Sequence, residues 1–130
     1  MTGVQTCALP ILSGIDERGC KISGATPAAL EAYERALAAH QSWRGGAMEH
    51  LGVALQEAPS FVMAHVLQAW LLICSRDPQR VLSARPALAR AVGLPANERE
   101  RLHLAAIDAA LADDYDRASL RLDEIGRAHV

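Results

Sequence analysis

Hydrophobic positions are densest between Ser60 and Cys74, in the run SFVMAHVLQAWLLIC, where only His65 and Gln68 interrupt the apolar residues after Ser60. A helix that is apolar nearly all round is buried inside a fold. The run is also shorter than the roughly 20 residues that a bilayer crossing needs. We therefore expect a central helix, capped by Ser60, against which other helices pack.

Five further helices are predicted from apolar positions that recur three and four residues apart. They cover residues 26–43, 47–57, 78–92, 97–111 and 115–125. N-cap residues open three of them, at Thr26-Pro27, at Asp77-Pro78 and at the capping-box pair Asn97 and Glu100. Pro86 should kink or split the helix in which it falls, because it removes one backbone hydrogen bond.

The same spacing predicts which side chains face the core. Gly52 is interpreted as a close contact between helices, and Cys74 as a small buried hydrophobe. The predicted core positions, in chain order, are Leu30, Tyr33, Ala36, Leu37, His40 or Gln41, Ala47, Met48, Leu51, Ala54, Leu55, Val81, Leu82, Leu88, Ala91, Val92, Leu102, Ala105, Ala106, Ile107, Ala109, Ala110, Leu111, Ala118, Leu122 and Ile125.

Six helices with short connections predict three antiparallel hairpins, since short loops force neighbouring helices to pack antiparallel. Residues 12–25 contain three glycines and no helical period, so a loop or extended lead-in is expected there. No run of β-branched residues predicts a strand. The fold expected is all-α, with stacked hairpins over residues 26–124.

Both ends of the chain resemble translated DNA of a short-read sequencing adapter. Residues 1–11 read MTGVQTCALPI and residues 125–130 read IGRAHV, and these match the two complementary adapter strands in frame. Segments of this kind are excluded from fold reasoning. The natural material is then expected to run from about Leu12 to Asp123, as an internal fragment of a longer reading frame.

Composition narrows the class of protein. Half of the chain (51%) is hydrophobic and only 4% is aromatic, which favours closely packed helices. The net charge of -2 shows no basic excess of the kind that a nucleic-acid surface needs. Three cysteines without paired spacing favour a reducing cytoplasm over a disulfide framework, and the preference for arginine over lysine suggests a bacterial source.

Candidate catalytic and metal-binding residues are sparse. His50 and His65 lie on consecutive predicted helices, with Glu49 or Glu57 as a possible third ligand, but no zinc or calcium motif accompanies them. We interpret these histidines, and also His40 and His103, as helix-face residues. His65 and Cys74 are too far apart on one helix to form a nucleophile pair, and Ser23-Gly24 in GCKISG lacks the order of a phosphate-binding loop. We therefore expect no catalytic residue, metal or cofactor.

We interpret two groups of charged residues as solvated helix faces and keep one alternative for each. Glu98, Arg99, Glu100 and Arg101 form a run at a helix start, where acids suit the helix dipole; a peptide contact is the alternative. The second group lies just before and along the helix over residues 78–92, and a phosphate or carboxylate clamp is the alternative there. It consists of Arg76, Arg80, Arg85 and Arg90.

The spacing of the helices resembles tetratricopeptide repeats. Pro59 and Pro95 are 36 residues apart, close to the repeat period of about 34, and each precedes a new first helix. The chain departs from the repeat at Asp113, where a glycine is usual, and at His65, where Trp is common. The positions that carry the likeness in the last hairpin are Leu102, Ala106, Asp114, Tyr115 and Ala118.

Three segments resemble, more specifically, the N-terminal part of the tetratricopeptide repeat protein 38-like family. They are SGATPAALEAYERAL, EAPSFVMAHVLQAWLL and GLPANERERLHLAAIDAALADDYDRA, at residues 23–37, 57–72 and 93–118. Members of this family are helical-repeat proteins without an established catalytic motif. The resemblance implies a tetratricopeptide-like α-solenoid that continues after residue 123.

The expected function is a non-catalytic scaffold that binds a protein or peptide, with no membrane or nucleic-acid partner. Solenoids bind on the concave face formed by their first helices, here Leu30–Gln41, Ser60–Cys74 and Glu98–Leu111. Truncated solenoid ends would favour self-association. The alternatives are a sensory or oligomerisation arm of a larger enzyme or regulator, and a self-contained six-helix bundle that binds a small ligand.

Overall fold

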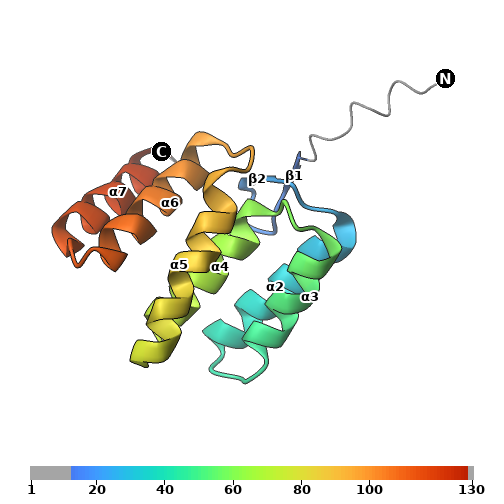
Figure 1. Ribbon diagram of the computed structural model, residues 1–130. Coiled ribbons are helices and arrows are strands. Elements are labelled where there is room, and N and C mark those ends of the chain that lie inside the picture. Colours follow the sequence, from blue (N-terminus) through green and yellow to red (C-terminus); the bar gives the residue numbers. More distant parts are fainter. Residues whose placement is uncertain (1–12, 129–130) are drawn as a thin grey trace. The chain divides into compact units, whose positions relative to one another are not determined.

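The computed structural model describes residues 13–128, in which two short strands precede six helices (Figure 1). The chain divides into two compact units, Met1–Ala64 and His65–Val130. Across the described residues the all-α prediction is confirmed apart from one small sheet. The proposed tail at residues 1–11, together with residues 129 and 130, lies outside the described part, whereas residues 125–128 continue the last helix.

The first unit begins with an antiparallel hairpin, β1 (Ser13–Ile15) and β2 (Lys21–Ser23). Ser13 pairs with Ser23 and Ile15 with Lys21, and Ile22 is buried. Residues 12–25 were predicted as a loop or extended lead-in with no strand pattern, so the pairing of two strands there corrects that prediction. Three-residue strands contain too little alternation of apolar and polar positions to be recognised from a sequence.

A polar network fixes the hairpin turn to the first helix, α2 (Pro27–Gln41). Asp16 Oδ1 accepts hydrogen bonds from the backbone N–H groups of Arg18 (2.9 Å) and Cys20 (3.0 Å). The Arg18 guanidinium lies 3.0 Å from both Asp16 Oδ2 and Glu34 Oε1. Burial alone would raise the pKa of Asp16, but the hydrogen bonds from Cys20 and Arg18 outweigh it and hold that pKa below its usual value.

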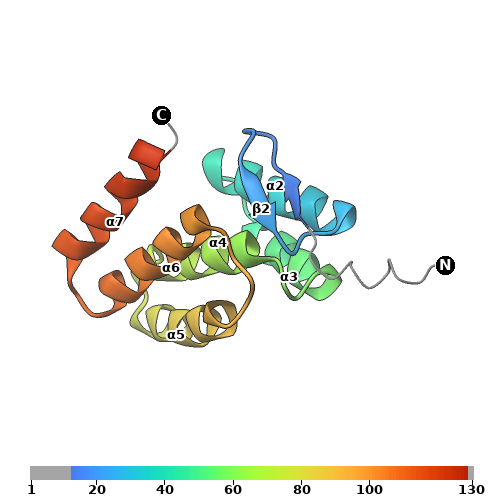
Figure 2. The same ribbon diagram turned by 90° about the horizontal axis from the view of Figure 1, so that it is seen from above.

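Helix α2 starts at the predicted cap, where the Thr26 side chain accepts a hydrogen bond from the backbone N–H of Ala29. The next helix, α3 (Ala47–Glu57), lies beside it as an antiparallel partner (Figures 1 and 2). Leu30 and Leu37 are only half-buried and His40 is exposed, because small residues occupy most of the buried face. That face consists of Ala29, Ala32, Tyr33, Ala36 and Ala39.

Helix α3 buries Leu51 and Ala54, as predicted. Gly52 is exposed, and no atom lies within 4 Å of the position that a Cβ would take there. The interpretation of Gly52 as a close helix contact was therefore wrong. A glycine in a helix without a packing reason lowers the stability of that helix relative to alanine.

The hairpin joins the rest of the first unit through Gly24, whose backbone has a φ of +80°. A Cβ at this position would stand 1.9 Å from the backbone oxygen of Ser60, so a larger residue does not fit. Nearby, the rings of Tyr33 and Phe61 pack with their centroids 5.1 Å apart. These contacts hold the hairpin, α2 and the segment before the next helix together.

The central apolar run forms α4 (Val62–Ile73), and the boundary between the two units falls inside it. The helix begins after Phe61, so the prediction that Ser60 caps it was wrong. Cys74 follows the helix and is exposed, contrary to its interpretation as a buried residue. The predicted burial is confirmed at Val62, Met63, Ala64, His65, Val66, Ala69 and Leu72.

In the second unit, α5 (Pro78–Val92) starts at the predicted cap, where Asp77 Oδ1 accepts the backbone N–H of Gln79 (3.0 Å). Pro86 does not split the helix, which continues through it as one segment. Pro86 and Leu82, four residues earlier, are both exposed. Water can therefore bond to the Leu82 carbonyl, which Pro86 leaves without its helical donor.

The last two helices, α6 (Glu98–Leu111) and α7 (Tyr115–Ala128), lie side by side after a tight turn at Asp113, where φ is +59°. The predicted capping box of α6 is confirmed. Small residues line the contact between these helices, and two large side chains of α4 pack against them. This cluster consists of Ala109, Ala110, Ala118, Trp70 and Ile73.

Several large side chains predicted to face the core are exposed instead. Leu82 is 68% exposed, Val92 62% and Leu122 41%. Ala105 is exposed too, whereas Leu104, which the sequence pattern did not select, is buried. On α5 the buried face consists of Ala84, Ala87, Leu88 and Ala91, and the larger Leu82 and Val92 lie outside it. On α6 residue size does not decide burial, since Leu104 is buried and Ala105 is exposed.

Candidate functional site

The residues considered as metal ligands do not gather in the described part of the chain. His40, Glu49 and Glu57 are exposed, His50 is half-buried and His65 is buried. Within residues 13–128 no three His, Cys, Asp or Glu side chains are placed to hold a metal ion. The metal-binding alternative therefore has no assembled ligand set among these residues.

The other nucleophile and phosphate-loop candidates also remain apart. His65 and Cys74 are separated by about 13.5 Å along the axis of a helix, from a rise of about 1.5 Å per residue. Ser23 ends strand β2, and Gly24 approaches the Ser60 carbonyl. The GCKISG segment is therefore strand and turn, with no helix N-terminus of its own.

His103 of α6 has a strongly shifted pKa. Burial and, to a smaller extent, the neighbouring positive charge of Arg99 lower this pKa to about 4. The imidazole is therefore neutral near pH 7. Because a general acid or base works best with a pKa near the operating pH, this shift gives His103 no catalytic assignment.

The four arginines considered as an anion clamp have different surroundings. Arg85 Nη2 donates to the Leu111 carbonyl at the end of α6 (3.1 Å). Arg90 Nη2 lies 3.4 Å from Gln68 Oε1 of α4. Arg76 and Arg80 are exposed. Two of the four thus connect helices of the second unit, which leaves the clamp alternative with only half of its charges.

The charge run at the start of α6 is not uniformly solvated. Glu98 and Arg101 are exposed, but Glu100 is completely buried. Its Oε1 accepts the backbone N–H of Asn97 at 2.9 Å, and Asn97 Oδ1 accepts the backbone N–H of Glu100 at 2.9 Å. The interpretation as a solvated face was therefore wrong for Glu100.

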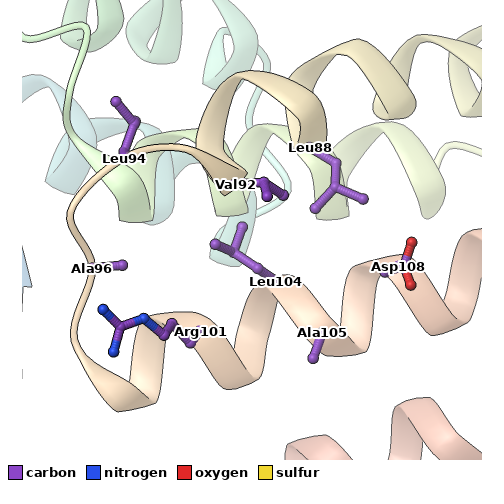
Figure 3. Close-up of a pocket in the computed structure, with 8 residues that line it drawn as sticks. All are labelled: Leu88, Val92, Leu94, Ala96, Arg101, Leu104, Ala105 and Asp108. Atoms are coloured by element: carbon purple, nitrogen blue, oxygen red, sulfur yellow. The ribbon is translucent and has the colours of Figure 1, made fainter.

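A groove of about 450 Å³ runs between α5 and α6 in the second unit (Figure 3). Arg101 lies at the end near the connecting loop and Asp108 at the other end, with Leu88, Val92 and Leu104 between them. We call this the α5–α6 groove, and its lining residues are Leu88, Val92, Leu94, Ala96, Arg101, Leu104, Ala105 and Asp108. Its volume is within the range of natural ligand sites, about 300–1,000 Å³.

Both ends of the α5–α6 groove are held in place. At one end the short connection over residues 93–97 joins the two helices. At the other end the hydrogen bond from Arg85 to the Leu111 carbonyl links α5 to the last turn of α6. Because these walls are already fixed, less conformational entropy is lost when a ligand binds between them.

Sequence reasoning identified only one side of this groove. Among the three segments predicted to line a binding face, Glu98–Leu111 contributes, but the opposite wall comes from α5 and the connecting loop. Val92 had been placed in the core, and Asp108 had not been selected. Whether Val92 and Asp108 are exposed depends on how α5 and α6 pack against each other. Helical periodicity does not encode that packing.

Comparisons with protein-family models, with curated proteins and with solved structures found no match to this chain. In the part of the chain that the structure describes, no helix has both the length and the apolar character needed to span a membrane.

Proposed function

We propose that this chain is part of a tetratricopeptide-like helical-repeat scaffold that binds a protein or peptide segment and catalyses no reaction. The observation that carries the proposal is the α5–α6 groove, an apolar channel with a charged side chain at each end. Antiparallel pairing of α2 with α3 and of α6 with α7 supports the repeat architecture. Free thiols at Cys20 and Cys74 agree with a location in the cytoplasm.

The proposal is tested by selecting a displayed library of random peptides on the immobilised full chain. Selected peptides should bind the Val92→Glu variant at least tenfold more weakly, because the charge falls inside the groove. The matched control is Leu82→Glu, which places the same charge on the same helix at an equally exposed position outside the groove. The proposal is wrong if no peptide is enriched, or if selected peptides bind both variants equally well.

Self-association is a second part of the proposal. Helix α7 carries the exposed apolar side chains Tyr115, Leu120 and Leu122, which support contact with another copy of the chain. Sedimentation over a hundredfold range of concentration should show a rising average mass. A constant monomer mass over that range would contradict this part.

A further inference from the structure

The floor of the α5–α6 groove offers a short apolar surface. Leu88 and Leu104 are each 8% exposed and form its base, whereas Val92 is 62% exposed and stands at its edge. Figure 3 shows Leu104 directed toward Val92 across the groove. A ligand that covers this surface removes apolar area from water and is stabilised in proportion to that area.

The charges at the two ends of the groove have opposite signs. Within residues 13–128 the Arg101 guanidinium has no hydrogen bond or ion pair. The Asp108 carboxylate has one distant partner, Arg117, at 4.0 Å, and Arg117 also lies 3.7 Å from Asp114. Both groove charges are therefore accessible to a ligand.

The separation of these charges indicates the length of the ligand. Arg101 and Asp108 are seven residues apart on α6, which corresponds to about 10.5 Å at about 1.5 Å per residue. A peptide in the polyproline II conformation advances about 3.1 Å per residue with three residues per turn. Side chains three positions apart in such a peptide therefore lie on one face about 9 Å apart, close to the distance between the two charges.

From this charge complementarity we propose that the α5–α6 groove recognises a short extended peptide segment with an acidic residue, two apolar residues and a basic residue in succession. The acidic residue pairs with Arg101, the basic residue pairs with Asp108, and the two apolar side chains cover Leu88, Val92 and Leu104. This inference rests on the proposed peptide-binding function and names its ligand class.

The test uses NMR titration of the ¹⁵N-labelled full chain with the blocked peptide acetyl-Asp-Leu-Leu-Arg-amide. Amide shifts should change at the groove residues. Arg101→Gln and Asp108→Asn should each weaken binding about threefold, the size expected for an exposed ion pair. Leu82→Glu should bind with unchanged affinity, and raising the salt concentration should weaken the wild-type complex.

Charge reversal gives a sharper version of the same test. The Arg101→Glu variant should prefer acetyl-Arg-Leu-Leu-Arg-amide over the original peptide, because the groove then has an acidic group at both ends. Wild-type chain should show the opposite preference. A loss of fold in this variant would remove both complexes, so the reversed preference reports recognition of charge rather than structural damage.

The failure of this inference can be distinguished from failure of the proposed function. If Val92→Glu abolishes binding while Arg101→Gln and Asp108→Asn leave it unchanged, the groove binds apolar segments regardless of charge and the inference is wrong. The inference is equally wrong if the probe peptide leaves the groove amides unshifted while library-selected peptides still depend on Val92. If neither the probe nor any library peptide binds, both proposals are wrong.

Discussion

Replacing Gly24 by alanine should detach or strongly destabilise the β-hairpin of the first unit. Two costs combine at this residue. Holding a residue other than glycine at the left-handed φ of +80° costs about 1–2 kcal/mol. The added Cβ would stand 1.9 Å from the Ser60 backbone oxygen, and forcing an extra methyl group into a packed contact costs about 1–3 kcal/mol more.

The two costs together predict a loss of about 2–5 kcal/mol, a large share of the 5–15 kcal/mol by which a typical domain is stable. Urea unfolding followed by circular dichroism measures the global part of this loss. Hydrogen exchange at the Cys20 amide, which donates to Asp16 inside the hairpin turn, measures local detachment. Protection of this amide should fall with the stability of the hairpin.

Gly19→Ala provides the matched control. Gly19 has nearly the same φ, +82°, but no atom lies within 4 Å of the Cβ position. This variant should therefore lose only the conformational part, about 1–2 kcal/mol. The contact between Gly24 and Ser60 would be refuted if Gly24→Ala cost no more than Gly19→Ala in both measurements.

Three further predictions concern other parts of the chain. Gly52→Ala should raise the free energy of unfolding by about 0.5–1 kcal/mol in urea titrations, since the site is open and helical; a loss of stability would reveal a hidden contact. The pKa of His103, lowered to about 4, lies below its unfolded value of about 6.5, so the unfolded chain binds more protons between these values. Stability should therefore fall as the pH drops from about 6.5 to about 4, and His103→Gln should flatten that dependence of the urea midpoint. In a Cys7→Ser background, Ellman's reagent should react with the exposed Cys74 rapidly and with the buried Cys20 only on unfolding; equal rates would contradict their different burial.

Helix starts could be predicted from the sequence because their signals are local. Thr26, Asp77 and Asn97 each cap a helix through hydrogen bonds to backbone groups two or three residues away. Such contacts need no tertiary structure, so a short stretch of sequence specifies them. Ser60 was the exception, since the helix begins only after the turn that places Phe61 against Tyr33.

The candidate site could not be predicted in the same way. Helical periodicity placed Val92 and Leu82 in the core with Leu88 and Ala91, but only the last two are buried. Periodicity gives the direction of an apolar face, whereas its width depends on how closely the neighbouring helix approaches. The groove exists because α6 covers only part of that face, which is a property of two helices rather than of one.

Alanine at the buried positions of α2 and α6 determines which substitutions this chain can tolerate. Alanine loses no side-chain conformational entropy on burial, but it also has no alternative rotamer with which to absorb a larger neighbour. Helices separated by alanine are spaced by their backbones, near the short end of the range of about 8–10 Å. Substitutions at Ala36 or Ala109, both 0% exposed, would therefore move whole helices apart, while side chains at the helix edges can vary. The side chains that line the α5–α6 groove can then change without disturbing the helix spacing that forms it.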